Sequence, residues 1–112
     1  MKKITLPLLA AAVPMLLGGV ARSADIPDTW SKNCASCHGP DGTGHTKAGR
    51  MAQVKDMTSA DYQKGFTDEQ AIKQIKEGFK DSSGKERMKA FADKLSDDEV
   101  KALVAYVRSL SK

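Results

Sequence analysis

The feature that most constrains this chain is a pair of cysteines with a histidine beside them. The only two cysteines are Cys34 and Cys37, and His38 follows at once, which gives the pattern C-x-x-C-H. Residues three apart on a helical turn share one face, so both thiols can reach the same group. This spacing is typical of c-type haem attachment, in which two thioethers hold the porphyrin and the histidine binds the iron. The pattern therefore predicts one covalently bound haem c, with His38 as the proximal iron ligand.

Three other interpretations of the cysteine pair are weaker. A thioredoxin-like redox pair should lie near a βαβ pattern, and nothing around it resembles one. A zinc site needs more ligands, but there is no second cysteine pair and His45 is the only other histidine. A disulfide would suit an exported chain. The adjacent histidine and the export signal described below favour haem over all three.

The chain is long enough for one domain but short for a large core. It has 112 residues, of which 40% are hydrophobic and 29% charged, so it is neither collagen-like nor disordered in composition. Its six aromatic residues are Trp30, Tyr62, Phe66, Phe79, Phe91 and Tyr106. A domain of this size buries a modest fraction of its surface. We therefore expect it to gain stability by folding around a large apolar group.

Residues 1–23 are interpreted as a cleaved secretory signal peptide. Two lysines near the N-terminus precede an uninterrupted run without polar side chains from Leu6 to Ala21, which contains two prolines. The run is shorter than the ~18 residues expected of a membrane span, so an uncleaved anchor is disfavoured. The cleavage point stays open: Ala21 and Ser23 satisfy the small-residue rule, and Ala24 satisfies it poorly.

The charge of the rest of the chain gives no reason to expect nucleic acid. The formal net charge is +4, but three of the 18 basic residues and none of the 14 acidic residues lie among the first 24 residues. The remainder is close to neutral, whereas nucleic-acid binding needs a concentrated basic face. We therefore expect a single domain over residues 24–112 that is exported to the periplasm, monomeric and not inserted in the membrane.

Residues 30–110 resemble the small monohaem class I c-type cytochromes of bacteria. The resemblance lies in residues 33–39 around the cysteines, in residues 41–44, and in residues 94–99 running into 103–108. It implies an all-α fold of the class I cytochrome c type, in which three main helices and short turns wrap around one covalently bound haem. It also implies transient docking with redox-partner proteins rather than catalysis on a substrate.

The candidates for the second axial ligand are His45, Met51, Met57 and Met88. His45 lies seven residues after His38, too close to pass around the porphyrin rim without strain. Met51 and Met57 lie on one early loop, where methionine commonly fills gaps. In the resembled family the distal methionine lies on a loop shortly before the last helix, which implies Met88. The family often has proline after this methionine, whereas Lys89 follows it here.

Ligation by histidine and methionine fills both axial positions of the iron. This disfavours binding of O₂ or peroxide and leaves outer-sphere electron transfer. We therefore expect an exported single-electron carrier whose haem is held by Cys34, Cys37, His38 and Met88. The alternative is a haem-bearing subunit through which electrons enter a larger periplasmic oxidoreductase complex. An enzyme with an open iron site is a third possibility.

The secondary structure is expected to be entirely helical. Helices are predicted over about 27–36, 67–79 and 96–110, with one short helical turn at 59–64. Capping boxes mark the starts of the last two main helices, at Thr67 with Gln70 and at Ser96 with Glu99. Residues 39–57 and 81–94 are expected to be loops, and no segment alternates as a strand would.

Two contacts of the haem scaffold are also expected. The resemblance implies that Trp30 packs on the last helix, against Leu103 and Tyr106. A ligating histidine usually donates its other ring N–H to a carbonyl. We expect His38 Nδ1 to donate to a backbone carbonyl of residues 49–51.

Basic residues gather around the expected distal ligand. They are Lys80, Lys85, Arg87 and Lys89, with Asp81 and Glu86 among them. Such a rim could steer an acidic partner toward the haem edge. A solvated charged loop would look the same in the sequence.

Overall fold

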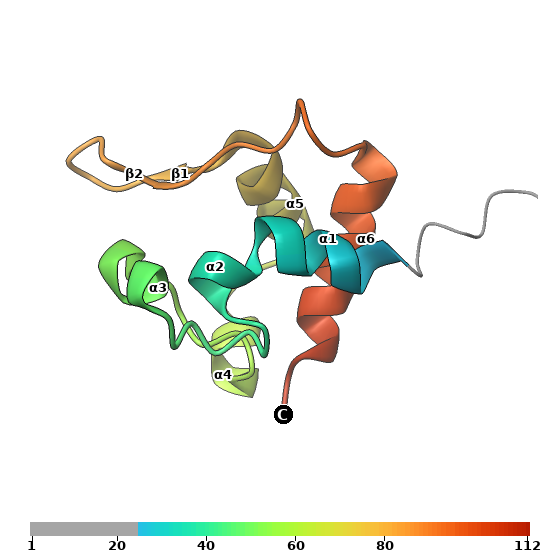
Figure 1. Cartoon of the computed structure of the whole chain (residues 1–112), viewed down its shortest axis with the longest axis horizontal. Helices are drawn as coiled ribbons and strands as arrows, with labels where there is room; N and C mark the ends of the chain where they lie inside the picture. The colour runs from blue at the N-terminus through green and yellow to red at the C-terminus, as the bar shows by residue number, and fades with distance from the viewer. Residues whose placement is uncertain (1–24) are drawn as a thin grey trace, which may run out of the picture.

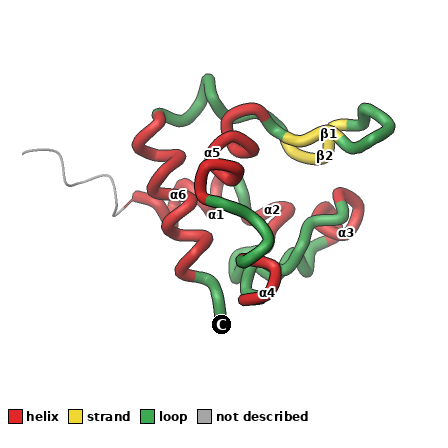
Figure 2. Tube along the Cα trace, turned by 180° about the vertical axis from the view of Figure 1, so that it is seen from behind, coloured by secondary structure: helices red, strands yellow, loops and turns green. Residues whose placement is uncertain are grey.

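The computed structural model describes residues 25–112, and the predicted signal peptide lies outside the described residues. The elements in chain order are α1 (Ile26–Asn33), α2 (Ala35–His38), α3 (Lys47–Ala52), α4 (Ala60–Gln63), α5 (Asp68–Glu77), β1 (Phe79–Lys80), β2 (Glu86–Met88) and α6 (Asp97–Ser109). Helices α1 and α6 cross on one side of the molecule, and the β1–β2 hairpin and α3 lie on the other (Figures 1 and 2). The mostly helical architecture predicted from the sequence is confirmed.

Both predicted capping boxes are present. Ser96 Oγ accepts the Glu99 N–H at 3.2 Å, and the Glu99 carboxylate accepts the Ser96 N–H at 3.1 Å. The same reciprocal pair joins Thr67 and Gln70 at the start of α5. These bonds satisfy N–H groups that have no partner within the helix, which explains why α5 and α6 begin where the sequence predicts.

The core forms where α1 crosses α6. An apolar stripe of α6 is buried, and its members are Val100, Leu103, Val104 and Val107. Trp30 of α1 is 3% exposed, and its ring centroid lies 5.3 Å from that of Tyr106. The predicted packing of Trp30 on Tyr106 is confirmed, and Leu103 belongs to the same buried cluster. Trp30 Nε1 also donates to the Gly39 carbonyl at 3.0 Å, which fixes the end of α2 to the core.

One predicted helix and one predicted loop differ from the structure. The first helix is broken at Cys34, whose φ of −120° turns α2 away from the direction of α1. The loop expected over residues 39–57 contains α3. This helix begins at Thr46, whose Oγ1 accepts the Gly49 N–H at 2.8 Å, and it ends at Gln53, which has the left-handed φ of 59°. A side-chain cap therefore forms a helix in a segment whose apolar pattern is too weak to predict one.

The expectation that no strand is present is wrong. Strands β1 and β2 pair antiparallel, with Phe79 opposite Met88 and Lys80 opposite Glu86. Strands of two and three residues are too short to show an alternating pattern in the sequence. The turn between them is organised by Asp81, whose Oδ1 accepts the N–H groups of Ser83 at 2.9 Å and Lys85 at 3.0 Å. The expected distal ligand thus lies on a hairpin.

None of the helices in residues 25–112 combines the length and the apolar character that crossing a bilayer would need.

Arg108 joins α6 to the segment that precedes α5. Its Nη1 and Nη2 donate to the carbonyls of Gln63 at 2.5 Å and Phe66 at 2.8 Å. Its Nε donates to Asp68 Oδ1 at 2.9 Å, and the guanidinium lies 4.3 Å from the centroid of the Phe66 ring. One side chain therefore satisfies two carbonyls that helix hydrogen bonds leave free.

Replacing Arg108 tests this connection. Arg108→Met keeps most of the apolar stem but removes every donor, so we expect the free energy of unfolding to fall by about 2 kcal/mol. Asp68→Asn removes only the exposed ion pair and should cost less than about 1 kcal/mol. Denaturant unfolding followed by circular dichroism measures both. Equal losses in the two variants would show that the carbonyl contacts contribute nothing.

The hairpin turn predicts a defined pH dependence. The Ser83 hydroxyl first, then the Lys85 N–H and the Arg87 guanidinium, hold the pKa of Asp81 well below its usual range. The ionised carboxylate therefore adds stability above the unfolded-state pKa of about 4, and this stability is lost as the pH falls through the lower folded-state pKa. The stability difference between the native chain and Asp81→Asn should be constant from about pH 6 to 8 and shrink below about pH 4. A difference that grows on acidification would contradict this.

Candidate functional site

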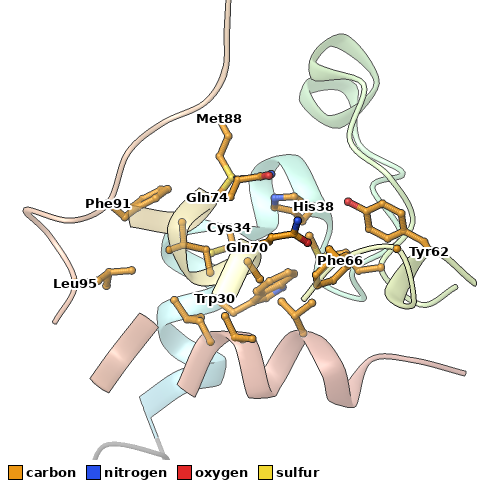
Figure 3. Close-up of a pocket in the computed structure, with 17 residues that line it drawn as sticks. Trp30, Cys34, His38, Tyr62, Phe66, Gln70, Gln74, Met88, Phe91 and Leu95 are labelled. Carbon is orange, nitrogen blue, oxygen red and sulfur yellow. The ribbon is translucent and has the colours of Figure 1, made fainter. Parts of the chain in front are cut away.

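Two adjoining cavities lie between α2, α5 and the hairpin. Their volumes are about 250 and 620 Å³, and the larger falls within the ~300–1,000 Å³ typical of small-molecule sites. The smaller extends inward to the core residues Trp30, Phe66 and Leu103. Residues that line both cavities are Cys34, His38, Met57, Tyr62, Gln74, Met88 and Phe91. Figure 3 shows several of these side chains, which come from four different segments of the chain.

Cys34 lies between α1 and α2, Cys37 lies within α2, and no disulfide joins them. Burial first, and then the neighbouring Cys37, raise the pKa of the Cys34 thiol to about 11. Cys34 is therefore a protonated thiol at neutral pH. A thioredoxin-like nucleophile needs a pKa lowered toward neutrality, so this environment argues against that interpretation of the motif.

His38 lies at the end of α2, against the core. Its ring centroid lies 5.8 Å from that of Trp30, and burial lowers its pKa. The imidazole is therefore neutral at pH 7, which is the form that binds a metal ion. Its Nδ1 is buried without a hydrogen-bond partner.

The predicted bond from His38 Nδ1 to a carbonyl of residues 49–51 is not formed. All three carbonyls in this stretch have other donors because the chain here folds as α3. The Gly49 carbonyl accepts from Val54 N–H at 3.0 Å, and the Arg50 carbonyl accepts from Gln53 N–H at 3.3 Å. The Met51 carbonyl accepts from Arg87 Nη1 at 3.0 Å.

Only two of the four candidate second ligands line the cavities. His45 and Met51 line neither cavity, and the Met51 side chain is 69% exposed. Met57 and Met88 line both cavities. Met57 is tied to the His38 side of the site, because its N–H donates to the Gly42 carbonyl at 2.9 Å. Met88 enters from the hairpin, a separate element (Figure 3).

Two polar side chains of α5, Gln70 and Gln74, line the smaller cavity, and Gln74 also lines the larger. Neither was predicted from the sequence to be a site residue. Gln70 and Gln74 are four residues apart and therefore share one face of the helix. Gln74 Nε2 lies 4.0 Å from Met88 Sδ, at the limit of a hydrogen bond to sulfur, and the two side chains lie close to each other in Figure 3. The i, i+4 glutamine pair beside the apolar stripe of α5 is the signal that could have identified them.

These residues fit a haem. The site combines an apolar cavity, two cysteines three residues apart, a neutral imidazole and a thioether from another element. Thioether sulfur and imidazole are axial ligands found in c-type haem sites. Among residues 25–112 no three His, Cys, Asp or Glu side chains gather as a metal site would require, so the ligands of a structural zinc are not assembled there.

The expected basic rim is partly neutralised. Of the four expected basic residues, Arg87 and Lys89 line the larger cavity together with Glu86, and Lys32, Lys55 and Lys94 also line it. Arg87 Nε donates to Asp81 Oδ2 at 2.8 Å, so its charge is paired within the hairpin.

Comparisons with known proteins agree with this geometry. A family model described as Cytochrome c matches residues 23–111. Among solved structures, a c-type cytochrome called KustC0563 is similar, with a TM-score of 0.68 and 36% sequence identity over 77% of this chain and 96% of that chain. A point mutant of KustC0563 has a TM-score of 0.67 and 36% identity, over 78% and 99% of the two chains. No curated protein matches the chain.

Gly49 is a position beside the site that leaves no room for a side chain. An added Cβ would lie 2.2 Å from the Cys37 carbonyl oxygen and 2.6 Å from that of Gly44. Gly49→Ala must therefore displace α3 or the cysteine turn, and we expect a loss of about 3 kcal/mol in the free energy of unfolding. Gly65→Ala is the matched control, because its Cβ would meet only the Tyr62 carbonyl at 3.2 Å. A Gly49→Ala chain as stable as the control would contradict this packing.

Proposed function

The chain belongs to the cytochrome c family, and from this premise we propose that it is a periplasmic single-electron carrier with His38 and Met88 as axial ligands. Family members carry covalent haem c and are electron carriers rather than enzymes. We assign the two thioether bonds to Cys34 and Cys37. The observation that carries the proposal is that Cys34, Cys37, His38 and Met88 all line the larger cavity. Cys34, His38 and Met88 also line the smaller, mainly apolar one.

Met88 is preferred over Met57 as the second ligand because of where each is anchored. Met57 is fixed to the loop that follows His38, and its carbonyl accepts from Gln63 Nε2 at 2.7 Å. The segment that carries Met88 is anchored instead to α5, through bonds from Phe91 N–H to the Ile75 carbonyl at 2.9 Å and from Ala92 N–H to the Lys76 carbonyl at 3.2 Å. Ligands on two independently anchored elements can approach an iron from opposite faces.

The residues around the cavity suit electron transfer. When bound, haem iron gains and loses one electron at a potential set by its ligands, by hydrogen bonds and by burial. Trp30, Phe91 and Leu95 exclude water from the inner wall. Gln74 offers an amide N–H to the Met88 sulfur and draws electron density from it. These side chains belong to elements with well-defined packing, so little rearrangement is required between the two oxidation states.

The proposal also includes cleavage of a signal peptide and a monomeric mature chain. The n-region, the apolar run and the small residues that follow support cleavage of residues 1–23 and a mature domain over residues 24–112. We propose that the mature chain is a monomer that docks transiently with donor and acceptor proteins. Size-exclusion chromatography of native extract tests this, because a subunit of a larger complex would elute with its partners rather than at the mass of the domain.

Substitution of the two cavity methionines tests the ligand assignment. Met88→Ala should abolish the red absorption band of methionine-ligated ferric haem and give a high-spin spectrum, because the iron loses its sixth ligand. The chain should still carry covalent haem, since the cysteines and His38 are unchanged.

Two other methionine variants are the controls. Met57→Leu and Met51→Leu should both retain the band, because neither side chain is proposed as a ligand. Loss of the band in Met57→Leu with retention in Met88→Ala would reverse the assignment. Haem that is extracted from the native chain by acidified acetone would contradict the covalent attachment itself.

A further inference from the structure

Arg87 connects the two walls of the larger cavity. Its Nε donates to Asp81 Oδ2 at 2.8 Å, within the hairpin. Its Nη1 donates to the Met51 carbonyl at 3.0 Å, which lies 36 residues away in α3. The hairpin contributes Phe79, Arg87 and Met88 to one wall, and the end of α3 contributes Ala52 with Gln53 to the other. Within residues 25–112, no other hydrogen bond joins the hairpin to α3.

The Arg87–Asp81 pair is better shielded than the other ion pairs of residues 25–112. Both side chains are 22% exposed, whereas each of the other four pairs has at least one partner that is 60% exposed or more. Asp81 is itself held by the N–H groups of Ser83 and Lys85 and by the Ser83 hydroxyl. A partly shielded, multiply bonded pair is worth more than an exposed one.

The acceptor in α3 has no donor within its own helix. The Met51 carbonyl belongs to the last turn of α3, where carbonyls lack partners within the helix. A guanidinium at this end satisfies such a carbonyl and is favoured by the helix dipole. The connection therefore stabilises both elements that it joins.

We propose that Arg87 is a positioning residue for Met88. By tying the hairpin to α3, it keeps Met88, its neighbour in β2, directed into the cavity and opposes the opening that would let an outside molecule replace the thioether. The inference rests on the proposed function, in which Met88 is an iron ligand. Arg87 restrains the segment that carries Met88. The next residue does not, because Lys89 leaves the backbone free where a proline would restrict its φ angle.

The test measures how readily imidazole replaces Met88 in the oxidised holoprotein. Arg87→Met removes both contacts but keeps the length of the stem. Loss of the charged hydrogen bonds should increase the population of the open state, so the apparent Kd for imidazole should fall about tenfold. The red methionine band should also disappear at a lower pH than in the native chain. Arg87→Lys keeps the charge without the two-pronged geometry and should give an intermediate Kd.

Arg108→Met is the matched control. Arg108 also joins separate segments through several hydrogen bonds, but it lines neither cavity. Its loss should lower the free energy of unfolding while changing the Kd for imidazole less than twofold. If Arg87→Met and Arg108→Met change this Kd equally, or if Arg87→Met leaves it unchanged, the positioning role is refuted. If Arg87→Met does not fold, the Kd for imidazole of Arg87→Lys and of Asp81→Asn is compared with that of Arg108→Met, and the same criteria apply.

Met88→Ala separates this inference from the proposed function. If that variant keeps the red band, Met88 is not the ligand and both the ligand assignment and the inference fail. If Met88→Ala loses the band and Arg87→Met behaves like Arg108→Met, only the inference fails.

Discussion

The packing of Trp30 is the interaction on which the rest of the structure depends. Its ring lies against Tyr106 of α6 on one side and near His38 on the other, and its indole N–H bonds the Gly39 carbonyl. Trp30 therefore contacts both α6 and the end of α2, the short helix that carries Cys37 and His38. The buried apolar side chains of residues 25–112 are few, so the cavity beside Trp30 is a large share of the interior. A haem in that cavity would complete the core as well as carry the electron.

The parts of the fold that were predictable have local causes. The starts of α5 and α6 follow from capping boxes, each written within four consecutive residues. The burial of Leu103 and its neighbours follows from helical periodicity. The attachment motif is likewise local, because its two thiols and imidazole lie within five residues. For such features, the sequence contains every group that the interaction needs.

The features that were missed either are too short to leave a pattern or depend on partners far away in the chain. The hairpin is too short for a pattern, and its turn is set by an Asp81 side chain that accepts several bonds. The expected partner of His38 was wrong because helix α3 and Arg87 occupy the carbonyls of residues 49–51. The position of Gln74 beside Met88 depends on how α5 packs against the hairpin. The environments of His38 and Gln74 are therefore decided by the tertiary arrangement, which the sequence does not display.

The contact between Arg87 and α3 has a consequence for how this sequence can diverge. The guanidinium recognises a main-chain oxygen of Met51, which every amino acid carries, and the Met51 side chain itself points into solvent. Substitutions at position 51 are therefore expected to be tolerated. Positions 81 and 87 bond through their side chains, so a change at one selects for a compensating change at the other. In an alignment of close relatives, positions 81 and 87 should therefore vary together, whereas position 51 should vary independently of both.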